Sequence, residues 1–232
     1  QVEASRETLV WAISGVLFAV PVLAVLGGSV DTLRRGKVAV SGGLIAAFAS
    51  AMLLLLASLS AAVAALNTAT STSLFALDAG SFAETTPGLS VGQFYLLIAV
   101  AATGGLAGLF HWGDRIVAGG LPGGAGKAIA PIALVGGGLF GIGQVVIGIA
   151  GPDESGVKLL GTVSAVGAVL LGLAALVAFA AFVGARLGGR GAAEDDDPGE
   201  LGGTLEWATA SPPPAGNFET IPGPVESAYP LF

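Results

Sequence analysis

The sequence has no cysteine and a single histidine, and each shortage excludes a class of chemistry. Without cysteine the chain cannot form a disulfide, a cysteine zinc site or an iron–sulfur cluster. With His111 alone, a histidine-ligated cofactor has almost no donors here. Charge is also scarce, since 11% of the 232 residues are charged, against about 25% in soluble domains. A net charge of −7 without a basic stripe argues against nucleic-acid binding.

Long apolar runs are what the sequence has instead. Hydrophobic residues make up 53% of the chain, and the mean hydropathy is +0.84. A transmembrane helix needs about 20 mainly apolar residues, and several uncharged runs are long enough. The sequence therefore predicts an all-α integral membrane protein with about five transmembrane helices, near residues 8–30, 38–66, 90–112, 128–151 and 158–186. The polar stretch 67–73 is predicted to be a loop.

The distribution of lysine and arginine predicts the orientation. With the N-terminus outside, only Arg6 and Lys158 fall on the outer side. The other basic residues fall on the cytoplasmic side, as the positive-inside rule favours: Arg34, Arg35, Lys37, Arg115, Lys127, Arg186 and Arg190. We therefore expect a multi-pass protein of a prokaryotic plasma membrane, with its C-terminus in the cytoplasm. The first residue, Gln1, is compatible with a removed leader or with a longer chain.

Charge and composition divide the chain into two parts. Residues 1–190 form the predicted five-helix domain and hold nine basic and eight acidic residues. Residues 191–232 hold eight acidic residues and no basic one, and they are rich in proline and glycine. This composition predicts an extended cytoplasmic tail without a core of its own. Its acidic run is interpreted as a solvated surface, with a docking segment or adaptation to high salt as alternatives.

Glycines recur at helical spacing within the predicted spans. Gly104 and Gly108 lie four residues apart, as do Gly137 and Gly141. Small residues at this spacing let two helix backbones approach closely in lipid, so we predict that these four glycines pack helices together. Pro21 lies within the first predicted helix and is expected to distort it.

Residues 204–218 carry a specific resemblance. They resemble the end of subunit I of haem–copper cytochrome c oxidases, where a TLEW-x-T-x-SPPP-x-x-NF pattern follows the last transmembrane helix. The matching residues are Leu205, Glu206, Trp207, Ser211, Pro212, Pro213, Pro214, Asn217 and Phe218. The segments 19–21, 91–95, 106–116 and 148–152 resemble parts of the last five helices of that subunit. The resemblance implies the same five-helix architecture and a connection with aerobic electron transport.

The haem ligands of that family are replaced in this chain. Two histidines in a V-A-H-F-H segment ligate the two haem irons in the family. The corresponding segment here is 91–95, which places Gln93 and Tyr95 at the two ligand positions. His111 lies at the other end of the same predicted helix, so no shift of the alignment recovers two histidine ligands. His111 is interpreted as an interfacial residue, with a proton or metal role as the alternative.

Three further family positions have also changed. The threonine and lysine that feed protons toward the oxygen site correspond to Val22 and Val25. A His-Asp pair that supports a magnesium site corresponds to residues 85–86, which are both threonine. An arginine pair that neutralises the haem propionates corresponds to residues 153–154, which are aspartate and glutamate.

These replacements predict a haem-free, subunit I-like membrane subunit of a respiratory cytochrome c oxidase complex, with a scaffold or accessory role. We expect no catalytic residue, cofactor or metal in this chain, and we expect haem and copper in partner subunits. The predicted partners are other respiratory oxidase subunits and the lipid bilayer. Two alternatives stay open: a processed or split portion of a catalytic subunit I, and a small transporter or channel subunit.

Overall fold

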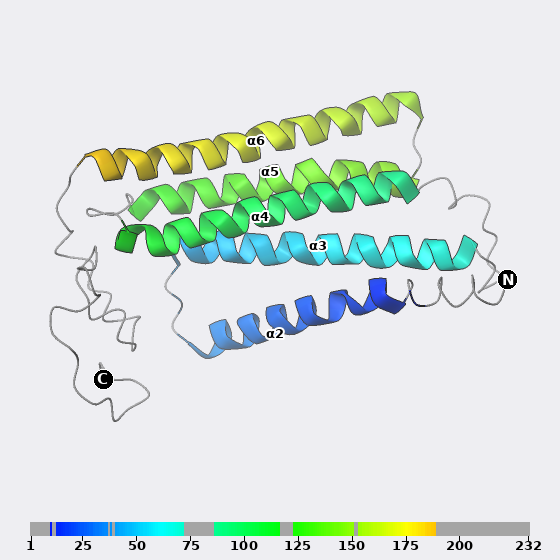
Figure 1. Ribbon diagram of the computed structural model, residues 1–232, viewed down its shortest axis with the longest axis horizontal. Helices are drawn as coiled ribbons and strands as arrows, with labels where there is room; N and C mark the ends of the chain where they lie inside the picture. The colour runs from blue at the N-terminus through cyan, green and yellow to red at the C-terminus, as the bar shows by residue number, and fades with distance from the viewer. Residues whose placement is uncertain are drawn as a thin grey trace.

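The computed structural model describes residues 10, 13–36, 38, 40–71, 86–116, 123–150 and 153–188 (Figure 1). Within these residues the secondary structure is helical, and five helices are long and apolar enough to cross a membrane. The predicted fold class is therefore confirmed. The acidic tail, with its Trp207 and proline motif, lies outside the described residues.

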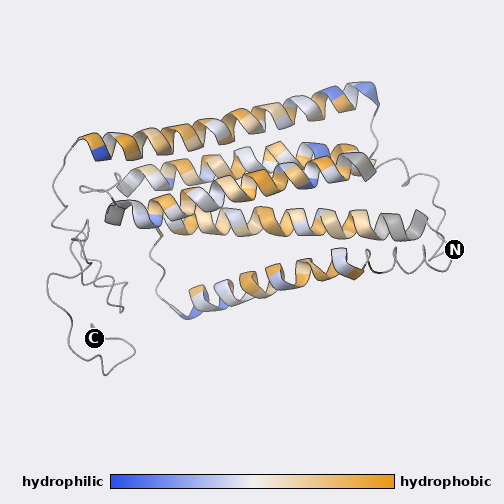
Figure 2. Ribbon diagram, in the orientation of Figure 1, coloured by the Kyte–Doolittle hydropathy of each residue, from blue (hydrophilic) through white to orange (hydrophobic). Residues whose placement is uncertain are grey.

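Five helices run up and down in sequence order (Figure 1). They are α2 (Ala19–Arg35), α3 (Gly42–Ser71), α4 (Thr86–Ile116), α5 (Gly123–Ala150) and α6 (Glu154–Leu187). Helices α3, α4 and α5 pack against one another, α6 packs mainly against α5, and α2 packs mainly against α3. Hydropathy follows the same plan, because hydrophilic residues gather at the helix ends and hydrophobic ones between them (Figure 2).

The first apolar span is interrupted near its beginning. Residues 13–17 are helical, Phe18 forms a turn, and α2 follows, giving a continuous apolar span of Ile13–Arg35. Pro21 has no backbone N–H, so the carbonyl of Leu17 lacks its usual intrahelical donor. The interruption of the helical hydrogen bonds thus lies within one turn of Pro21, while the backbone of Phe18 keeps helical angles (φ −62°, ψ −28°).

Most described helix ends differ from the predicted bounds by one to five residues: α2 ends at Arg35 rather than near 30, and α4 covers Thr86–Ile116 rather than 90–112. Helix α3 continues to Ser71, so residues 67–71 of the predicted loop are helical. This segment contains neither proline nor glycine, and its polar residues are only mildly unfavourable in a helix. Helix α5 begins at Gly123, five residues before the predicted start near 128.

One face of α5 is in close contact with α4 and α3. A Cβ atom added at Gly137 would lie 2.9 Å from the Cβ of Ala99 and 3.0 Å from the Cδ1 of Leu53. A Cβ added at Gly141 would overlap Leu96. Both glycines therefore lie where a neighbouring helix leaves no room for a side chain.

The glycine pair of α4 is packed less closely. A Cβ at Gly104 would lie 3.3 Å from the Oγ of Ser50, and this hydroxyl donates a hydrogen bond of 3.0 Å to the carbonyl of Val100. A Cβ at Gly108 would meet nothing within 4 Å, so the predicted close packing is not found at that position. Spacing of four places both glycines on one helix face, but of the two only Gly104 has an atom of α3 within 4 Å of an added Cβ.

A second face of α5 is in close contact with α6. A Cβ at Gly136 would lie 2.6 Å from the backbone nitrogen of Leu171 and 3.0 Å from the carbonyl oxygen of Gly167. A Cβ at Gly143 would lie 2.5 Å from the Oγ of Ser164. Atoms of α6 therefore lie where side chains at Gly136 and Gly143 would be, so the two helices approach closely at these glycines. The Ser164 hydroxyl, which is buried without a hydrogen-bond partner among the described residues, lies at this contact next to Gly143.

Replacing Gly167 by alanine should destabilise the bundle, because the added methyl group meets the backbone of α5. We expect a loss of about 1–3 kcal/mol, typical of overpacking, measured by denaturant unfolding followed by circular dichroism. Gly172→Ala is the matched control on the same helix, since a Cβ there meets nothing within 4 Å. The control should be neutral or slightly stabilising, and equal losses in the two variants would contradict the close-contact interpretation.

Candidate functional site

The segment of α4 that contains Gln93 and Tyr95 is the candidate site. Buried residues recur along α4 at intervals of three or four and form the stripe that faces the bundle: Leu89, Gly92, Leu96, Ala99, Thr103 and Leu106. Gln93 and Tyr95 flank this stripe, and both are half-buried. At about 100° per residue their side chains leave the helix about 200° apart. The two positions therefore lie on different sides of α4.

Tyr95 lies on the α5 side of the helix. Its ring stacks on Phe140 of α5, with 4.3 Å between ring centroids and 12° between ring planes. Phe94 is tilted against the same tyrosine at 6.5 Å but is itself exposed. Stacked aromatic pairs add stabilisation beyond the area they bury. Tyr95 thus has a packing role that is complete within this chain.

Gln93 lies on the α3 side of the helix. It shares a helix face with Val100 and Gly104, which follow at seven and eleven residues. Both of those residues contact Ser50 of α3. The helix face that carries Gln93 is therefore the one that contacts α3 further along α4, whereas Tyr95 itself contacts α5.

The residues at these positions do not fit a haem. Neither an imidazole nor a thiolate is available, and the tyrosine, which can ligate haem iron in some proteins, is stacked on Phe140. On both sides of Tyr95 the α4 and α5 backbones are close: a Cβ at Gly92 would lie 2.6 Å from the nitrogen of Val145, and one at Gly141 would overlap Leu96. Among the described residues there is also no group of three or more His, Cys, Asp or Glu that could hold a metal ion.

His111 lies far from this segment. Eighteen residues separate it from Gln93, which is about 27 Å along a helix. Its ring packs edge-on against Trp112 with 4.9 Å between centroids, and both side chains are exposed at the end of α4. The structure therefore does not bring His111 together with Gln93 and Tyr95.

The two valines at the predicted proton-feeding positions lie on α2. Val22 is buried against the bundle, whereas Val25 is exposed. Neither side chain carries a group that can transfer a proton. Thr86 is the first residue of α4, and Thr85 lies outside the described residues.

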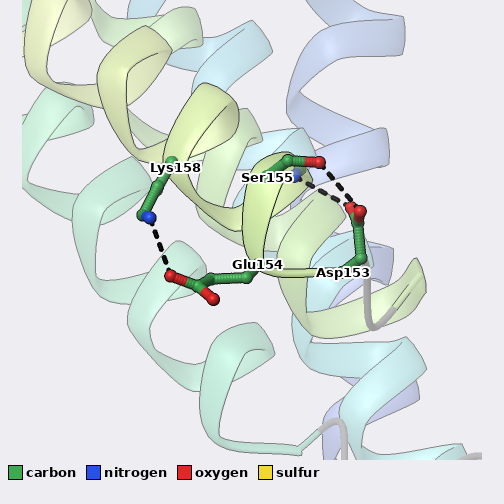
Figure 3. A network of polar contacts seen from close by, with 5 residues as sticks. Asp153, Glu154, Ser155 and Lys158 are labelled. Atoms are coloured by element: carbon green, nitrogen blue, oxygen red, sulfur yellow. Dashed lines mark hydrogen bonds and ion pairs between the residues drawn. The ribbon is translucent and has the colours of Figure 1, made fainter.

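Asp153 and Glu154 begin α6 (Figure 3). The carboxylate of Asp153 accepts hydrogen bonds from the Ser155 hydroxyl at 2.8 Å and from the Gly156 amide at 3.0 Å, which makes it the N-cap. These bonds, led by that of Ser155, lower the pKa of Asp153. Glu154 forms an exposed ion pair of 2.7 Å with Lys158, one turn further on. The acidic pair therefore serves the start of its own helix.

Part of the chain is similar to curated proteins of two Streptomyces species. The chain is 42% identical over 78 residues to a protein of Streptomyces avermitilis named "Putative cytochrome c oxidase subunit 1-beta". It is 40% identical over 82 residues to a protein of the same name from Streptomyces coelicolor. Each alignment covers 33% of this chain and 13% of the relative. No family model and no solved structure matches the chain.

Sequence reasoning missed two contacts of the site. The Asp153 cap had a signal, because an aspartate directly before an apolar run with an acidic residue in the first turn is typical of a helix start. The stacking of Tyr95 on Phe140 had none, because 45 residues separate the two rings and only the packing of α4 on α5 joins them.

The Asp153 cap should make stability depend on acidity. Because the pKa of Asp153 is lower in the folded chain than its ordinary value of 3.8, its contribution is complete above that value. It is lost as the pH falls through the lowered pKa. We therefore expect the melting temperature of the wild type to fall more steeply below pH 4 than that of Asp153→Asn, which keeps an accepting oxygen without the charge. Thermal unfolding followed by circular dichroism across this range measures both, and parallel curves would contradict the prediction.

Proposed function

We propose that this chain is a haem-free, subunit I-like membrane subunit of a respiratory cytochrome c oxidase complex. Its role is that of a scaffold or accessory subunit, with haem and copper held by partner subunits. The observation that carries the proposal is which residues occupy the two haem-ligand positions of α4. Gln93 and Tyr95 stand where the resemblance places haem ligands, and Tyr95 is committed to Phe140.

The comparisons support the oxidase part of the proposal. Two relatives carry the name of an oxidase subunit, and the five apolar helices suit a membrane-embedded complex. The proposed location is the plasma membrane of a prokaryote, with the N-terminus outside. The side chains at the two positions support the absence of haem from this chain. The amide of Gln93 and the stacked phenol of Tyr95 replace the two imidazoles that ligate haem iron in the family.

A second candidate is a processed or split portion of a catalytic subunit I. The name of the two relatives is compatible with it, since both are named as an oxidase subunit 1. Such a portion would still need both α4 ligands to be supplied from elsewhere. A transporter or channel subunit is less well supported, because charged residues in the described spans lie near the helix ends.

Purification of the tagged chain from its native membranes tests the association. We expect other oxidase subunits to copurify, together with a reduced-minus-oxidised haem spectrum. After the complex is dissociated in detergent, the haem should leave with the partner subunits. Stoichiometric haem that remains on this chain would contradict the haem-free role, and recovery of the chain alone in gentle detergent would contradict the association.

Variants of the two α4 residues test the role of the candidate site. Gln93→Ala and Tyr95→Phe should leave the haem content and oxygen consumption of the complex unchanged, because Tyr95→Phe keeps the ring that stacks on Phe140. Gly141→Leu should instead reduce the yield of assembled complex, since it forces α4 away from α5. Gly108→Leu is its control, at a position with open space. Loss of haem in either of the first two variants would favour the catalytic alternative.

A further inference from the structure

One end of the bundle collects exposed basic side chains. The up-and-down order brings the last turns of α2, α4 and α6 to the same end as the first turns of α3 and α5 (Figure 1). Arg34 and Arg35 close α2, Lys127 lies in the first turns of α5, and Arg186 lies in the last turn of α6. All four side chains are exposed. We call this group the basic end.

Most of the basic end has no acidic partner within the described part of the chain. Arg35 forms an ion pair of 2.9 Å with Asp31 on its own helix. No described carboxylate lies within 4.0 Å of Arg34, Lys127 or Arg186. The opposite end differs, because Lys158 there is paired with Glu154.

The acidic part of the chain follows directly from the basic end. Helix α6 ends at Leu187 with a cap at Gly188, and residues 191–232 carry eight acidic and no basic residues. The first acidic run is 194–197, which begins seven residues after Leu187. Seven residues span at most about 25 Å, whereas packed helix axes lie about 8–10 Å apart. The run can therefore reach Arg186 and, on the neighbouring helix α5, Lys127.

We propose that the acidic run 194–197 docks on the basic end at Lys127 and Arg186. Opposite charge supplies the attraction, and the covalent link to α6 holds the run at a high effective concentration near both residues. Anionic lipid headgroups attract the same basic side chains and repel the acidic run, so they are the competing partner that the test below includes. Arg34 is on α2, which is separated from α6 by other helices of the bundle. It belongs to the basic end but is not part of this docking site.

The absence of native cysteine allows a direct crosslinking test in the full chain. One pair joins Ala193→Cys, directly before the acidic run, to Gly124→Cys, which is exposed one turn before Lys127. The matched control pairs Ala193→Cys with Gly36→Cys on α2, at the same end of the bundle. In liposomes of zwitterionic lipid at low salt, we expect the first pair to give at least threefold more disulfide than the control. At 1 M salt the screening length falls to about 3 Å, and the excess should disappear.

Charge exchange separates docking from mere proximity. The double variant Lys127→Glu, Arg186→Glu should remove the excess crosslinking. Replacing all four residues 194–197 by lysine in that double variant should restore the excess. Circular dichroism checks that each variant stays helical. Equal crosslinking by the two pairs, or an excess that is insensitive to salt and to charge reversal, would overturn the proposal. An excess that is lost when anionic lipid replaces part of the zwitterionic lipid would also overturn it, since the basic end would then prefer headgroups.

Discussion

The fold depends on how closely α5 can approach its neighbours. In lipid there is no hydrophobic force between apolar helices, so association relies on close packing. Helix α5 meets this requirement twice, with Gly137 and Gly141 toward α4 and with Gly136 and Gly143 toward α6. The stacking of Tyr95 on Phe140 depends on the first of these contacts. The glycines of α5 therefore determine the helix arrangement. The close approach that they allow also brings Phe140 of this chain against Tyr95 at the candidate site.

The sequence predicted the five helices well because uncharged length is a direct physical requirement for crossing a bilayer. Boundaries were less predictable. Residues 67–71 are polar yet helical, because polarity alone does not stop a helix that lacks proline and glycine. Glycine spacing was also ambiguous: Gly108 and Gly141 belong to similar pairs, but only the second faces a neighbouring backbone. Such differences depend on where the other helices lie.

The sequence predicted which residues occupy the candidate site, but it did not predict which side chains they contact. One histidine in 232 residues already shows that the chain cannot supply two imidazoles. The resemblance then identifies the two positions that matter. It does not say what replaces the missing function at those positions. Tyr95 stacks on the ring of Phe140 from α5. At residues 153–154, Asp153 caps α6 and Glu154 forms an ion pair with Lys158.

Helix α2 is attached more weakly than the rest of the bundle. In its most apolar part 17% of the residues are buried, against 22% in α4 and α6 and 33% in α3 and α5, and α2 packs mainly against α3 alone. Its buried side chains, Ala19, Val22 and Leu26, all lie in its first half, where Gly15 also approaches Ala61 and Ala65 of α3. Tilting α2 about that contact breaks little packing. When bilayer thickness and helix length differ, we therefore expect α2 to tilt before α3 to α6 change their arrangement.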